Sequence, residues 1–173
     1  MSSAAVSRSA VGDRDTFVAR FGGVFEHSPW IAAAAFDAGL PEGPPTAARL
    51  HACMVAALRA ATQAQKRALI AAHPDLAGRL VRAGRLTTVS AKEQASAGLD
   101  LLTDAERARF TALNEAYQAK FGLPFVMAVK GRSKAEILAA FERRLDNSAE
   151  REFATALAEI ETIALLRLKE ILP

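Results

Sequence analysis

The sequence predicts an all-α fold, and three observations support this prediction. Apolar residues recur at helical spacing along most of the 173-residue chain, and much of its 51% hydrophobic content is alanine, the strongest helix former. Capping boxes, in which Ser or Thr precedes Glu or Gln by three residues, introduce several of these stretches. One run, 123–129, is typical of extended chain but has no second strand to pair with. We therefore expect a single-domain helical bundle over residues 13–173, after a flexible N-terminus at 1–12.

In the first half of the chain, each expected helix begins at a capping residue. In chain order these starts are Asp13, Ser28 with Pro29 in the first turn, Thr46, and the box Thr62–Gln65. The apolar face of the first helix comprises Phe17, Phe21, Val24 and Phe25. Gly39 is expected to end the second helix, and the helix that begins at Thr62 is expected to end near His73.

In the second half, a short helix over 75–81 is followed by further starts of the same kind. These are the boxes Ser90–Glu93, Thr103–Glu106 and Ser133–Glu136, and a weaker start formed by Asn147 with Glu150. The helix from Thr103 is expected to end at Gly122, directly before the extended run. The last helix is expected to be long, because its apolar positions continue at helical spacing from Phe153 to Leu168.

Composition excludes several classes of protein. The net charge is only +3 with the basic residues dispersed among acidic ones, and aromatic content is 6%, so we expect no nucleic-acid partner. No apolar run is long enough to span a membrane. The single cysteine, Cys53, fits a reducing compartment, and the first residues lack the apolar centre of a signal peptide, so a cytoplasmic location is expected. No metal-binding motif is present.

The pair His73–Pro74 is the leading candidate for a chemical role. An imidazole titrates near neutral pH, and Pro74 stops the helix that precedes it, which places His73 at the mouth of a helix. The alternative is a histidine that only favours a helix C-terminus through the macrodipole. Asp75, which follows, is expected to cap the next short helix.

Two further groups allow both a structural and a functional interpretation. Ser90 and Glu93 form a capping box, yet a helix N-terminus also binds anions if Glu93 faces a pocket. Gln94 offers an amide for a urea-like group, or is simply a solvated helix residue. Arg167, surrounded by apolar residues on the last helix, either reaches water or is held by an anion.

The extended run is expected to line a pocket. Between helices and without a partner strand, its backbone donors and acceptors are available to a ligand. The residues concerned are Phe125, Val126, Met127, Ala128 and Val129.

Taken together, these motifs resemble the 2-oxo-4-hydroxy-4-carboxy-5-ureidoimidazoline (OHCU) decarboxylases of urate degradation. The resemblance runs from about Phe17 onward. It rests on five segments: Phe21-Gly22-x-Val24-Phe25-Glu26-His27-Ser28-Pro29-Trp30, His73-Pro74-Asp75-Leu76, Ser90-x-x-Glu93-Gln94-x-x-Ala97-Gly98-Leu99, Asn114-x-x-Tyr117-x-x-Lys120-Phe121-Gly122-Leu123-Pro124-Phe125-Val126 and Ile160-x-x-Ile163-x-x-Leu166-Arg167-Leu168.

The resemblance implies a cofactor-free, usually dimeric carboxy-lyase that forms S-allantoin and CO2. It implies His73 and Glu93 as the catalytic residues. It implies a substrate-binding set of Pro74, Ser90, Glu93, Gln94, Phe125, Val126, Met127, Ala128, Val129 and Arg167. Three rival interpretations remain: a helical module that binds a ureide without turnover, a scaffold in which His73 only ends a helix, and a related enzyme with another substrate.

Overall fold

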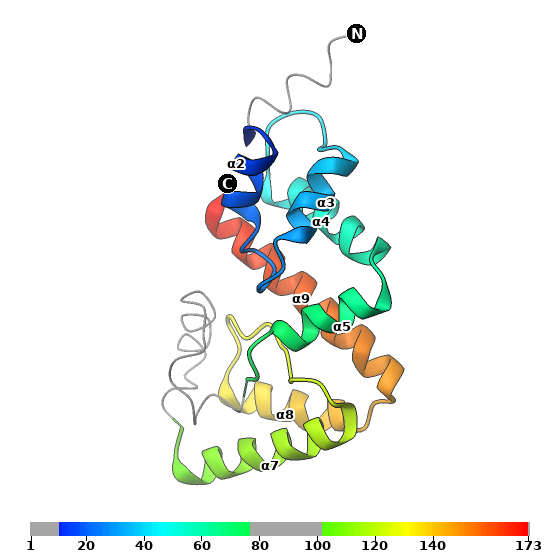
Figure 1. Cartoon of the computed structure of the whole chain (residues 1–173). Helices are drawn as coiled ribbons and strands as arrows, with labels where there is room; N and C mark the ends of the chain where they lie inside the picture. The colour runs from blue at the N-terminus through cyan, green and yellow to red at the C-terminus, as the bar shows by residue number, and fades with distance from the viewer. Residues whose placement is uncertain (1–10, 77–101, 173) are drawn as a thin grey trace. The chain divides into compact units, whose positions relative to one another are not determined.

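The structure, a computed structural model, describes residues 11–76 and 102–172 (Figure 1). The elements in these two ranges are helices, with no strand among them, so the all-α prediction is confirmed. The helices are α2 (Arg14–Phe21), α3 (Trp30–Ala38), α4 (Ala47–Ala60), α5 (Gln63–Ala72), α7 (Asp104–Phe121), α8 (Lys134–Leu145) and α9 (Ala149–Ile171).

The chain forms two compact units. The first comprises residues 1–72 and 161–173, and the second comprises residues 73–160. In the first unit, α3 packs against both α2 and α4. Its core is built on aromatic and aliphatic side chains, among which the Phe17 ring lies 4.9 Å from Phe21 and 5.4 Å from Phe36, centroid to centroid. Phe17 and Phe21 are four residues apart on α2 and thus share the face of this helix that is buried.

The second unit is built around α7, α8 and the segment between them, and α7 packs against α8 (Figure 1). Its core is an aromatic cluster. The rings of Phe125 and Phe141 stack at 3.7 Å, and Tyr117 meets both of them edge-on at 5.2 and 5.8 Å. All three side chains are fully buried. The extended segment is thereby fixed to the helices by its own Phe125 side chain.

Local capping explains where most helices begin, and these predictions are confirmed. Side-chain oxygens accept the expected backbone N–H groups at Asp13, Thr46, Thr62, Thr103 and Ser133. In the boxes, Gln65, Glu106 and Glu136 also accept the N–H of the capping residue. Gly39 ends α3, and Gly122 ends α7 in the left-handed conformation with φ 62°. The box Ser90–Glu93 lies outside the described residues. So do positions 77–81 of the short helix expected over 75–81.

Two predicted starts were wrong by one residue, and one helix is shorter than expected. Pro29 is the N-cap of α3, because the Ser28 hydroxyl donates to the Glu26 carbonyl at 3.0 Å instead of capping the helix. Ser148 caps α9 in place of Asn147, since its hydroxyl oxygen accepts the Arg151 N–H at 3.2 Å. Helix α2 ends at Phe21, so the buried side chains of Val24 and Phe25 belong to the turn that follows it.

Candidate active site

His73 lies directly after the last residue of α5 and is buried, with 5% of its surface exposed. Pro74 follows and is half-buried. This arrangement confirms that α5 ends near His73, because proline disfavours helical backbone in the residue before it. The imidazole is therefore removed from bulk water.

The His73–Pro74 segment is joined to the extended segment. The Leu76 N–H donates to the Phe125 carbonyl at 3.4 Å, a long bond that nonetheless sets the two stretches side by side. Asp75 anchors the same stretch to α7, because one of its carboxylate oxygens accepts Asn114 Nδ2 at 2.7 Å and Gln118 Nε2 at 2.6 Å. Two motifs distant in sequence, each predicted to carry site residues, are thus brought together.

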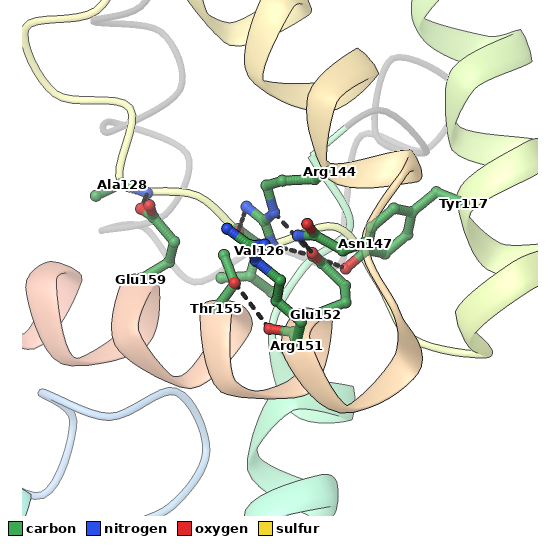
Figure 2. A network of polar contacts seen from close by, with 9 residues as sticks. All are labelled: Tyr117, Val126, Ala128, Arg144, Asn147, Arg151, Glu152, Thr155 and Glu159. Atoms are coloured by element: carbon green, nitrogen blue, oxygen red, sulfur yellow. Dashed lines mark hydrogen bonds and ion pairs between the residues drawn. The ribbon is translucent and has the colours of Figure 1, made fainter.

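The extended segment has no regular secondary structure from 124 to 129, and residues 125–129 are all buried. Three of its backbone groups are held by charged side chains. The Val126 carbonyl accepts Arg144 Nη1 at 2.7 Å, the Ala128 N–H donates to Glu159 Oε2 at 2.8 Å, and the Ala128 carbonyl accepts Arg132 Nε at 3.1 Å. Figure 2 shows Arg144 and Glu159 reaching this segment from α8 and α9.

A buried polar network supports the Arg144 contact (Figure 2). Glu152 is fully buried, and its Oε1 accepts Nε of Arg144 at 2.8 Å and the Tyr117 hydroxyl at 2.5 Å. Its Oε2 accepts Nδ2 of Asn147 at 2.8 Å. The Arg144 guanidinium also lies over the Phe125 ring, 4.2 Å from its centroid. A buried carboxylate is tolerated because its charge and both oxygens are matched.

Burial, and then the hydrogen bond to Glu152, raise the pKa of the Tyr117 hydroxyl well above its ordinary value of 10.0. The tyrosine consequently remains a hydrogen-bond donor at any physiological pH. This keeps the Glu152 carboxylate supplied with donors from three different elements.

Arg167 belongs to the first unit and is buried among apolar residues of α9. Its Nη1 donates to the Val24 carbonyl at 3.2 Å, and its Nη2 lies 2.9 Å from a carboxylate oxygen of Glu26, itself 1% exposed. Of the two possibilities left open by the sequence, the structure thus favours an arginine held by an anion. That anion is a carboxylate of the same chain, which fixes the orientation of the guanidinium.

The remaining predicted residues, Ser90, Glu93 and Gln94, lie outside the described residues. The facing of His73 and Glu93 therefore stays a prediction. Among the residues that are described, no three His, Cys, Asp or Glu side chains gather as a metal site would require. Nor does any described helix have the length and apolarity of a membrane span.

Sequence reasoning missed Glu26, which holds Arg167, and the residues that support the extended segment: Arg144, Glu152 and Glu159. A signal was present for two of them. Arg144 continues the apolar face of α8 formed by Ile137, Ala140 and Phe141, and Glu152 falls on the buried face of α9 with Ala156 and Ile160. Opposite charges on two inward faces indicate a buried ion pair.

Comparison with known proteins identifies the same family throughout. The family model described as OHCU decarboxylase matches residues 11–169. A 2-oxo-4-hydroxy-4-carboxy-5-ureidoimidazoline decarboxylase of Haloferax volcanii is 44% identical over 91% of this chain and 90% of its own length. One from Halalkalicoccus jeotgali is 42% identical over 92% and 86%, respectively. A crystal structure of (S)-allantoin synthase matches 93% of this chain with TM-score 0.73 and 32% identity. The present chain spans about half of that one, 51%.

Proposed function

The chain belongs to the OHCU decarboxylase family, and from this premise we propose that it converts OHCU to S-allantoin and CO2 in urate degradation. The observation that carries the proposal is that two family motifs lie side by side. In the motif His73-Pro74-Asp75-Leu76, the Leu76 N–H donates to the carbonyl of Phe125 in the 123–129 segment. Both stretches contain residues that the family resemblance assigns to the active site. The sequence match across nearly the whole chain supports the same conclusion.

The reaction needs no cofactor to accept electrons. When the carboxylate leaves as CO2, its bonding pair passes to the ring carbon, and the neighbouring C=N bond of the substrate can accept that pair. The protein must hold the carboxylate out of the ring plane, stabilise the developing negative charge, and deliver a proton to one face of the ring. Delivery from one fixed side would produce a single enantiomer.

His73 is the group that we assign to proton transfer, oriented by Glu93. Its burial supports this role, because an imidazole in a dry site exchanges protons with the substrate and not with bulk water. Glu93→Gln keeps the size of the side chain and removes its charge, so a loss of turnover would support the catalytic role. A loss of thermal stability alone would support the capping-box interpretation.

Binding of the substrate is assigned to Arg167, Ser90, Gln94, Pro74 and the backbone of 125–129. The Glu26 carboxylate orients the Arg167 guanidinium, as recognition of an anionic or carbonyl oxygen requires. Backbone N–H groups aimed at a developing charge are typically worth about 3 kcal/mol each in the transition state. The Ala128 N–H is already bonded to Glu159, so the donors for substrate come from its neighbours in the segment.

Several organisational features complete the proposal. The functional domain covers residues 13–173, a span supported by the family match over 11–169. The enzyme is a cytoplasmic homodimer that acts without cofactor, nucleic acid or membrane. Sedimentation equilibrium of the purified protein tests the dimer directly, and a single monomeric species would contradict it.

The decisive experiment replaces His73 with Asn. Urate oxidase and the upstream hydrolase generate fresh substrate, and the handedness of the allantoin is followed by circular dichroism. The spontaneous decay of OHCU supplies the background rate. The His73→Asn protein should stay folded, but allantoin should form at the uncatalysed rate and as a racemic mixture. His51→Asn is the matched control and should retain activity, since Nε2 of His51 lies 2.7 Å from the Glu161 carbonyl within the first unit and has no part in the proposed site. Wild-type protein that binds the substrate but leaves the decay unchanged would instead indicate a non-catalytic ureide-binding module.

A further inference from the structure

The extended segment presents two different edges. In extended chain, the N–H and C=O groups of alternate residues point to opposite sides. Val126 and Ala128 therefore share one edge, and Phe125, Met127 and Val129 share the other. The bonds from α8, α9 and Leu76 follow this alternation: α8 and α9 hold groups of Val126 and Ala128, whereas the Phe125 carbonyl accepts the N–H of Leu76. The Val129 carbonyl accepts the Arg132 N–H at 3.0 Å in the turn that ends the segment.

The second edge is the one that faces the His73 stretch, because Leu76 is only three residues beyond His73. On this edge the N–H groups of Met127 and Val129 have no acceptor among the residues that the structure describes. Both residues are buried, at 5% and 4% exposure. Buried N–H groups are nearly always satisfied, so donors at this position are suited to a bound molecule.

Glu159 binds the edge of the segment that Val126 and Ala128 share. It lies two turns after Glu152 on α9, is half-buried, and forms one wall of a cavity of about 500 Å³ lined also by Arg132, Arg143 and Arg151. Although arginines line the same cavity, the Glu159 carboxylate accepts the Ala128 N–H at 2.8 Å (Figure 2). Such a charge-assisted bond is roughly twice as strong as a neutral one.

We propose that Glu159 is a positioning residue of the decarboxylase: by holding the Ala128 N–H, it turns the Met127 and Val129 N–H groups toward the substrate. Arg144 supports the same edge through the Val126 carbonyl. This inference rests on the proposed function and extends it to a residue that touches no reacting atom. Loss of the bond lets the segment rotate about its axis, which moves the donors away from the charge that develops during decarboxylation.

Three variants test the proposal. Glu159→Ala removes the acceptor and should lower kcat about tenfold with little change in KM, since the donors act mainly in the transition state. Glu159→Gln keeps an oxygen that can accept the Ala128 N–H and should return kcat to within roughly threefold of wild type. Glu161→Ala is the matched control on the same helix: it breaks the ion pair with Arg59 at 2.9 Å and should leave kcat unchanged.

A readout independent of turnover accompanies the kinetics. Amide hydrogen exchange at Ala128 should become faster in Glu159→Ala, because its N–H loses its acceptor, but not in Glu161→Ala. Wild-type kcat and KM in Glu159→Ala would overturn the inference, as would equal losses of kcat in Glu159→Ala and Glu161→Ala. A wild-type protein without any turnover would refute the proposed function itself, and the exchange data would then show separately whether Glu159 orders the segment.

Discussion

Replacing Tyr117 with Phe tests whether the buried network is held together by individual hydrogen bonds. The substitution removes one oxygen and keeps the ring, which contacts Phe121, Phe125 and Phe141 at 4.8–5.8 Å between centroids. No cavity of consequence is created. The loss therefore isolates the bond from the Tyr117 hydroxyl to Glu152 Oε1.

The magnitude follows from what the carboxylate retains. Hydrogen bonds to charged groups contribute about 1.5–3 kcal/mol to stability. Oε1 of Glu152 keeps two donors from Arg144, Nε at 2.8 Å and Nη2 at 2.5 Å, so it is not left unsatisfied. We expect the lower end of the range, about 1.5 kcal/mol, which corresponds to a fall in Tm of roughly 3–6 °C for a chain of this length.

Urea unfolding followed by circular dichroism measures the change as a lower midpoint with an unchanged m-value. Thr111→Val is the matched control, because it deletes a hydroxyl on the same helix that donates only to the Arg107 carbonyl at 2.9 Å. It should alter stability by less than about 0.5 kcal/mol. A Tyr117→Phe midpoint equal to that of wild type or of Thr111→Val would refute the reasoning.

The same residue predicts an alkaline pH dependence. Tyr117 is the only tyrosine in the chain, so tyrosinate absorbance reports on it alone. Its pKa is raised in the folded state above the ordinary 10.0. The unfolded state therefore loses its proton first, and wild-type stability should fall as the pH rises above 10.0, whereas Tyr117→Phe should lack this dependence. Tyrosinate absorbance that develops in the folded protein at its ordinary pKa would contradict the burial argument.

Three further predictions concern the second unit. Phe141→Ala should cost about 3–5 kcal/mol, measured by urea unfolding, because it removes the fully buried ring stacked on Phe125; a cost below that of Tyr117→Phe would contradict this. Gly122→Ala should cost about 1 kcal/mol in Tm measurements, since a Cβ there meets no atom and only the left-handed φ of 62° is strained. Gly122→Asn should cost less, and equal losses would point to another cause. The pKa of Glu136 is lowered below 4.5 by the N–H of Ser133, so its contribution to stability is present above 4.5 and lost as the pH falls through the lowered pKa. Glu136→Gln should converge with wild type in acid unfolding profiles, and a constant difference would exclude this origin.

Helix boundaries were predictable because caps are local. The oxygens of Thr103 and Ser133 reach backbone N–H groups three residues away, so the signal is contained in four consecutive residues. The failures arose where another nearby group bound the expected capping side chain, as the Glu26 carbonyl does with the Ser28 hydroxyl. The Asn147 amide is occupied by the buried carboxylate of Glu152, which leaves Ser148 to cap α9.

The site was predictable where the chemistry lies in the side chain itself. His73 before Pro74 stands out because few residues titrate near neutral pH. The supporting residues were not found: the inward-facing charges of Arg144 and Glu152 indicate only a buried ion pair, and Glu159 is an ordinary helix residue by type and spacing. The roles of Arg144 and Glu159 depend on which backbone groups of 125–129 they meet, a matter of contacts 18 to 31 positions away in the chain.

The sequence by itself determined the all-α class, the starts of most helices and the family, because each depends on short-range pattern or on residue identity. Only the tertiary structure decided that the segment at 125–129 has one edge held by charged side chains and another beside the His73 stretch. The physical reason is that a backbone N–H or C=O group carries no sequence signature. Its availability to a ligand depends on which side chains, brought near by packing, have already bound it.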